Sequence, residues 1–72
     1  MRAISNVSEA VSHVDRFEGE PEDFALPIAE TMLDPVGVNM AIITDRVLAR
    51  GWEPNGFEQV PGVRIYRYKR LA

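Results

Sequence analysis

The sequence predicts an α+β fold in which three helices precede a C-terminal β-hairpin. Apolar residues recur at helical spacing through the first two thirds of the chain, and β-branched and aromatic residues then alternate around a Pro-Gly pair. A chain of 72 residues is long enough for one domain. We expect residues 1–72 to form a single small domain with helices at about 6–18, 24–33 and 36–50 and strands at about 57–60 and 63–70.

The first helix, residues 6–18, is predicted by one apolar face and by its start signal. Val7, Val11 and Val14 recur at spacings that place them on one side of a helix. Asn6 is a favourable N-cap, and a glutamate three positions later completes a capping-box pattern.

The second helix, residues 24–33, is predicted from a broad apolar stripe that follows Asp23 as its N-cap. Pro27 falls within the first turn, where backbone N–H groups have no partner inside the helix, so we expect it to be tolerated. The alternative is a break at Leu26 with only a short helix after it.

The third helix, residues 36–50, is apolar on most sides and should therefore be central to the core. Asp34 can cap it with Pro35 at the first helical position, and Asn39 is a rival cap. Gly51 suits the position after its last residue.

The hairpin surrounds Pro61-Gly62, and Pro54-Asn55-Gly56 before it is predicted to be a turn. Pro-Gly favours type I or II turns, which fit two-residue hairpins poorly, so the loop could be four residues long. If Val60 faces Val63, then Phe57, Tyr66, Tyr68, Gln59 and Arg64 share one face. We expect the opposite face, with Val60, Val63 and Ile65, to pack against the helices.

Composition argues against several kinds of chemistry. With no cysteine and only His13, neither a disulfide nor a Cys/His zinc site can form, and no glycine-rich phosphate loop is present. The four carboxylates within 18–23 are expected to be a solvated loop, since their spacing is not that of an EF-hand. We predict no enzyme activity, no cofactor and no metal.

No apolar run approaches the roughly 20 residues that a membrane-spanning helix needs. The N-terminus lacks the apolar segment of a secretory signal. We therefore expect a cytoplasmic protein without a membrane partner.

Charge is divided along the chain, and this division is the main functional clue. Residues 1–62 contain eleven acidic and four basic residues, a net charge of −7, whereas residues 63–72 contain four basic residues and no acid. Tyrosine and arginine are enriched at protein interfaces. The candidate interface residues are Arg64, Tyr66, Arg67, Tyr68 and Arg70 on the last strand and Glu18, Glu20, Glu22 and Asp23 on an acidic helical surface.

These observations predict a non-enzymatic adaptor or inhibitor that binds another protein. The acidic helical surface would meet a basic partner surface, which would also speed association. The strand at 63–70 is longer than the one at 57–60, so it could also pair with a second copy and form a homodimer.

Three helices followed by a hairpin resemble the winged-helix layout, in architecture only. That resemblance implies an alternative, a nucleic-acid-binding regulator that contacts DNA through helix 36–50 and the hairpin. An isoelectric point near 5.0 and a mostly apolar third helix argue against it, so nucleic acid is the less favoured partner. The residues of this alternative are Arg46, Arg50, Arg64, Arg67, Lys69 and Arg70.

Overall fold

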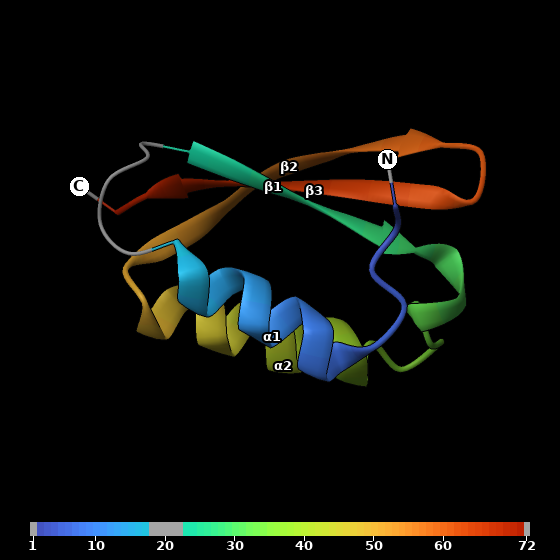
Figure 1. Ribbon diagram of the computed structural model, residues 1–72, viewed down its shortest axis with the longest axis horizontal. Helices are drawn as coiled ribbons and strands as arrows, with labels where there is room; N and C mark the ends of the chain where they lie inside the picture. The colour runs from blue at the N-terminus through green and yellow to red at the C-terminus, as the bar shows by residue number, and fades with distance from the viewer. Residues whose placement is uncertain (1, 18–22, 72) are drawn as a thin grey trace.

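The computed structural model describes residues 2–17 and 23–71. The elements in chain order are α1 (Val7–Arg16), β1 (Asp23–Ala29), a 3-10 helix η1 (Glu30–Met32), α2 (Val38–Ala49), β2 (Trp52–Val60) and β3 (Val63–Arg70). The strands form one antiparallel sheet in the order β1-β3-β2 (Figure 1).

The α+β class is correct, but the predicted arrangement of three helices, a hairpin and a winged-helix-like layout is wrong. The described part of the chain has two α-helices, and a third strand, β1, pairs with β3. The predicted third helix corresponds to α2, although it starts at Val38 rather than 36. Because β1 occupies the place of the predicted middle helix, no helix-turn-helix precedes the hairpin within residues 2–17 and 23–71.

The segment 24–33 forms β1 and η1 instead of the predicted helix. Its apolar residues give a buried face at strand spacing as well as at helix spacing, and pairing with β3 favours the strand. Pro27 fits β1 because its carbonyl accepts a hydrogen bond from the Ile4 N–H at 2.7 Å, on the edge away from β3. Its missing N–H faces the same edge, so the ladder with β3 loses nothing. Alternate side chains of the strand are buried on one face: Phe24, Leu26 and Ile28.

The hairpin between β2 and β3 is longer than predicted. Val60 pairs directly with Val63, so the Pro61-Gly62 loop has two residues, and Gly62 takes the positive φ of 77° that a type II turn requires. The predicted turn at 54–56 is instead an irregularity inside β2, where the register shifts between Pro54 and Phe57. Such a bulge lets the strand continue while adding to its twist.

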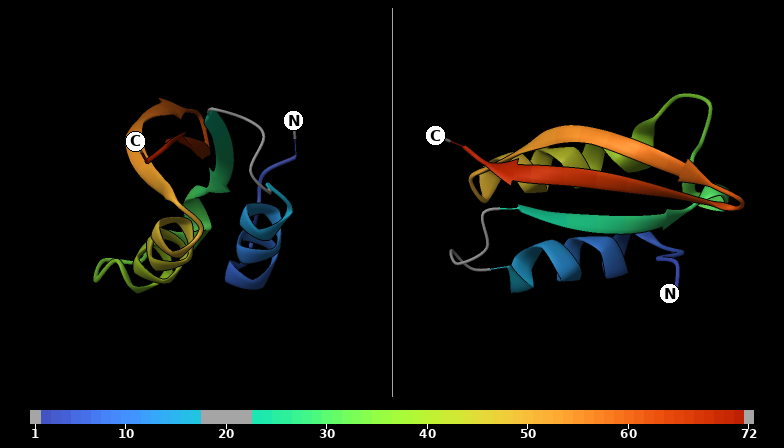
Figure 2. Two further views of the ribbon diagram at one scale, coloured as in Figure 1. Left: turned by 90° about the vertical axis from the view of Figure 1, so that its left-hand side faces the viewer. Right: turned by 90° about the horizontal axis from the view of Figure 1, so that it is seen from above.

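Both helices lie on the same face of the twisted sheet (Figures 1 and 2). They run in the same direction, α1 beside β1 and α2 beside β2. The opposite face is not covered by any element of the described chain, as the view from above in Figure 2 shows. Neither described helix is long and apolar enough to cross a membrane.

The core lies between the helices and the inner face of the sheet. Its buried residues come from both α-helices, η1, all three strands and the segment before α1: Ile4, Ala10, Val14, Phe24, Leu26, Ile28, Met32, Ile43, Val47, Trp52 and Tyr68. The prediction that Val60, Val63 and Ile65 face the helices is therefore wrong. Tyr68 points inward, so Val63 and Ile65, at odd offsets from it along β3, point to the opposite face, and Val60 shares that face because it pairs with Val63.

Asn6 caps α1 as predicted, whereas the predicted start of α2, with Asp34 or Asn39 as cap and Pro35 as first helical residue, is wrong, because its N-cap is Gly37. Asn6 caps α1 by accepting from the Glu9 N–H at 2.7 Å. Asp34 accepts from the N–H groups of Val38 and Asn39 at 3.0 and 3.2 Å, although the N-cap position of α2 is Gly37. These hydrogen bonds, above all the one from Val38, lower the pKa of Asp34.

Candidate functional site

The predicted Arg/Tyr strand is β3, and its period of two divides its residues between the two faces of the sheet. Arg64, Tyr66, Tyr68 and Arg70 lie on the face that carries the helices, because they pair with inward-facing residues of β1 and β2. Arg67 and its neighbour Lys69 lie on the uncovered face. The candidate residues therefore do not form one surface.

Tyr68 is part of the core rather than of an interface. It is 1% exposed and its ring stacks on Phe24 at 5.1 Å between centroids. Phe24 also meets Trp52 edge-on at 4.8 Å, and Arg70 lies over the Trp52 ring at 5.0 Å. The Tyr68 hydroxyl is buried without a hydrogen-bond partner in the described chain, and burial raises its pKa.

Phe57, Arg64 and Tyr66 form a group, here called the aromatic–arginine cluster, in which Phe57 is exposed and Arg64 and Tyr66 are half-buried. The Arg64 guanidinium lies over the Phe57 ring at 4.6 Å, and the Phe57 and Tyr66 rings are 5.8 Å apart. Phe57 is 57% exposed, which is unusual for a residue on the face that carries the helices. A cation stacked on a ring in this way gains cation–π attraction, and its position becomes fixed.

Gln59 holds the arginine of this cluster in place. Its side-chain oxygen accepts from Arg64 Nε at 2.9 Å, while its nitrogen donates to Glu30 Oε1 at 2.5 Å and to the Val60 carbonyl at 2.9 Å. Arg64 also donates to the Tyr66 hydroxyl at 3.4 Å. Within the described residues Arg64 forms no ion pair, in contrast to Arg67.

The charges of the uncovered face are paired across strands. Arg67 contacts Glu58 at 3.3 Å and Lys69 contacts Glu53 at 3.4 Å. All four side chains are about one third to one half exposed. Much of the positive charge that the sequence concentrates on residues 63–72 is therefore offset by carboxylates of β2.

The two helical arginines of the nucleic-acid alternative are also paired. Asp15 of α1 accepts from Arg46 at 2.9 and 3.0 Å and from Arg50 at 3.1 Å. These bonds join the C-terminal ends of two helices that run in the same direction, where cations also oppose the negative ends of both helix dipoles.

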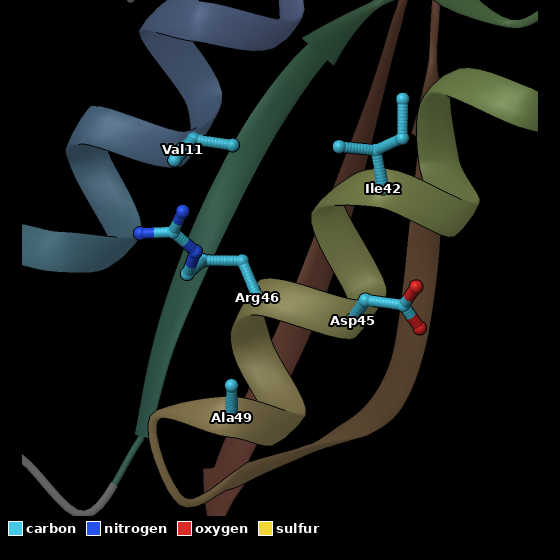
Figure 3. A pocket seen from close by; sticks show the side chains of 5 residues that line it. All are labelled: Val11, Ile42, Asp45, Arg46 and Ala49. Carbon is cyan, nitrogen blue, oxygen red and sulfur yellow. The ribbon is translucent and has the colours of Figure 1, made fainter.

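A shallow groove of about 280 Å³ lies between the helices on the side away from the sheet (Figure 3). Val11 of α1 and Ile42 of α2 line it, and Arg46 reaches across it toward α1. That guanidinium is bound by Asp15, and Asp45 is the other charged side chain among the described residues that line the groove. The groove combines a small apolar floor with one carboxylate.

The predicted acidic surface can be followed only in part. Glu18, Glu20 and Glu22 lie outside the described residues, and Asp23 is exposed at the start of β1. Among residues 2–17 and 23–71, no three His, Asp or Glu side chains are grouped so that they could hold a metal ion. His13 lies half-buried in the last turn of α1.

Sequence reasoning did not single out Phe57 as a functional residue. The signal was present, because pairing of Val60 with Val63 places Phe57 on the same face as Arg64 and Tyr66. What the sequence did not reveal is that the helices cover only part of that face and leave Phe57 exposed.

The aromatic–arginine cluster is suited to recognition rather than to proton transfer. Arginine remains protonated in proteins and offers several donors in a fixed plane, while the Phe57 ring offers an apolar stacking surface.

Comparisons of the chain with protein-family models, with curated proteins and with solved structures find no match.

Proposed function

We propose that this protein is a non-enzymatic binding module that contacts a protein partner through the aromatic–arginine cluster. The observation that carries the proposal is the position of Arg64, which is stacked on the exposed Phe57 ring and held by Gln59. Aromatic residues and arginine are enriched at protein interfaces, and they provide most of the residues whose loss weakens binding strongly.

Preorganisation supports the same proposal. Ordering a long side chain at an interface costs about 0.5–1.5 kcal/mol, and Arg64 is already ordered by its ring contact and its bonds to Gln59 and Tyr66. Because the guanidinium has no carboxylate partner within the described residues, it favours a partner that supplies a carboxylate or a carbonyl beside an apolar group.

The nucleic-acid alternative has less support. Arg46 and Arg50 are bound by Asp15, and Arg67 and Lys69 face carboxylates of β2. A base could still stack on Phe57 beside an arginine, because stacking tolerates any base. Binding of labelled nucleic acid is therefore a separate outcome of the test.

The test compares three variants with the wild-type protein. Partners captured from the native host are identified by mass spectrometry, and the affinity of the purified partner is then measured by calorimetry. Phe57→Ala combined with Arg64→Ala should weaken binding at least about 100-fold, as expected for two residues that dominate an interface. Arg64→Lys should also weaken it, because lysine keeps the charge but not the planar stack.

Arg67→Ala is the matched control, since it removes an arginine from the same strand on the opposite face. It should leave the affinity within about threefold of the wild type. Equal losses from Arg67→Ala and from the double variant would contradict the proposed site. Retention of partner affinity by the double variant, or tight binding of labelled DNA or RNA that the double variant abolishes, would contradict the proposed function.

A further inference from the structure

We propose that the uncovered face of the sheet is the interface of a homodimer. We call it the open sheet face, and its outward side chains are Asp23, Ala25, Pro27 and Ala29 of β1, Glu53, Glu58 and Val60 of β2, and Val63, Ile65, Arg67 and Lys69 of β3. A sheet face without a covering layer exposes apolar area that association can bury.

The open sheet face is apolar toward the β2–β3 turn, apart from Glu58 at the level of Ile65, and charged toward the other end. Val60, Val63 and Ile65 lie beside Pro27 and Ala29 of β1, and all five are only partly buried. The alanine and proline side chains of β1 extend little from the sheet, so a second layer can approach the backbone closely. The apolar half therefore supplies the non-directional part of an interface.

The charged half is divided into rows of opposite sign. The acids Glu53 and Glu58 belong to β2, and the bases Arg67 and Lys69 belong to the adjacent strand β3. With Asp23, the face has three acidic and two basic groups, so no partner of one strong charge is favoured. A partner must present the same two rows in exchanged positions.

A second copy meets that requirement. Consider a two-fold axis that lies between the two facing sheets, parallel to the strands and above the gap between β2 and β3. It places β2 of each copy over β3 of the other without any shift along the strand direction. Glu53 of each copy then lies opposite Lys69 of the other, and Val60 lies opposite Val63, because each of these pairs is already in register within one copy. The two Glu53–Lys69 pairs then form a network of four charges, whereas Glu58, which is level with Ile65, faces Arg67 of the other copy only diagonally.

The size of the face determines the strength that we expect. Three strands of about eight residues cover about 26 by 14 Å, well below the roughly 800 Å² per partner of a standard stable interface. The dimer should therefore be weak, with dissociation in the micromolar range or above, and sensitive to salt. The aromatic–arginine cluster lies on the other face of the sheet, so this dimer would leave the exposed Phe57 ring of each copy uncovered.

The experiment is sedimentation equilibrium of the full chain from about 10 µM to about 1 mM, the range in which an interface of this size associates. Two charge-swap variants are compared with the wild type. Arg67→Glu with Lys69→Glu makes both rows acidic, and Glu53→Lys with Glu58→Lys makes both rows basic. Asp45→Lys on α2 is the control, because it changes charge on the helical layer.

The wild type and Asp45→Lys should dimerise equally, and each charge-swap variant alone should be monomeric over the whole range. An equimolar mixture of the two swap variants should form a heterodimer, because acidic rows then face basic rows. Circular dichroism verifies the fold of each variant, and Lys69→Glu alone replaces the double change if that variant unfolds. A monomeric wild type at about 1 mM, dimerisation of either swap variant alone, or a mixture that stays monomeric would each overturn the proposal.

Discussion

Removal of the Tyr68 hydroxyl should stabilise the protein rather than weaken it. A buried polar group without a partner costs about 1–3 kcal/mol, and this hydroxyl is buried without a hydrogen-bond partner among the described residues. Tyr68→Phe keeps the ring that stacks on Phe24. We expect the free energy of unfolding at neutral pH to rise by about 1 kcal/mol, because part of the gain is lost where the oxygen leaves a small void.

The same change should alter stability in alkali. Burial raises the pKa of Tyr68 in the folded state above its value of about 10 in the unfolded chain. The folded state therefore favours the neutral hydroxyl, and its stability is fully present below about pH 10. Above that pH the unfolded chain ionises first, so stability falls by up to about 1.4 kcal/mol per pH unit. Tyr68→Phe should lack this loss.

Urea denaturation followed by the fluorescence of Trp52, the only tryptophan, measures both effects. The slope of the free energy with urea should be unchanged, since the exposed area is the same. Tyr66→Phe is the control, because it should keep the alkaline loss that Tyr68 causes. A loss of more than about 1 kcal/mol at pH 7 in Tyr68→Phe would show that the hydroxyl is hydrogen-bonded. An alkaline limb equal to that of the wild type would show that burial does not raise the pKa of Tyr68. Either result would refute the reasoning.

Two further changes test how the helices are held. Asp15→Asn removes the carboxylate that Arg46 and Arg50 both contact, and the three side chains are about 34–45% exposed. The change should therefore lower the free energy of unfolding by about 1 kcal/mol at low salt and by less at high salt. An equal loss at both ionic strengths would contradict this. Asp34→Ala should weaken the start of α2 at pH 7. The lowered pKa of Asp34 means that its contribution is present above about pH 4 and is lost as pH falls through the folded-state value, so urea melts of the variant and the wild type should converge at low pH. A difference that persists at acid pH would argue against the capping role.

The sequence predicted the elements whose signals are local. Asn6 and Glu9 mark the start of α1 through side-chain bonds within one turn, and the apolar run that ends before Gly51 marks α2. β3 and the last four residues of β2 followed from alternation around Pro61-Gly62, whereas the first part of β2 was predicted to be a turn. Each of these signals depends on residues a few positions apart, so no tertiary information was needed.

The segment at 24–33 could not be assigned in the same way. Every residue from Phe24 to Ala29 is apolar, so a period of two and a period of 3.6 both find a buried face. What decides in favour of β1 is its pairing with β3 and the bond between Ile4 and the Pro27 carbonyl, and both partners are distant in sequence. Tertiary pairing thus overrode the local pattern.

The candidate site was predictable to a similar extent. Alternation placed Arg64 and Tyr66 on one face and Arg67 on the other, which the register confirms. The buried residues of β1 lie on the same face as Tyr68, and this face packs against the helices. Because the sequence analysis predicted a helix in place of β1, it assigned the wrong inner face and predicted Tyr68 to be an interface residue. Phe57 follows directly after the bulge in β2, and its exposure could not be read from the local pattern.

The most direct test of the proposed function is a map of the partner contact by NMR. Amide chemical shifts of the labelled protein are recorded as the captured partner is added. The proposal predicts that the largest changes occur at Phe57, Arg64 and Tyr66 and at their neighbours in β2 and β3. Changes concentrated on the groove between α1 and α2, with the cluster unaffected, would contradict it.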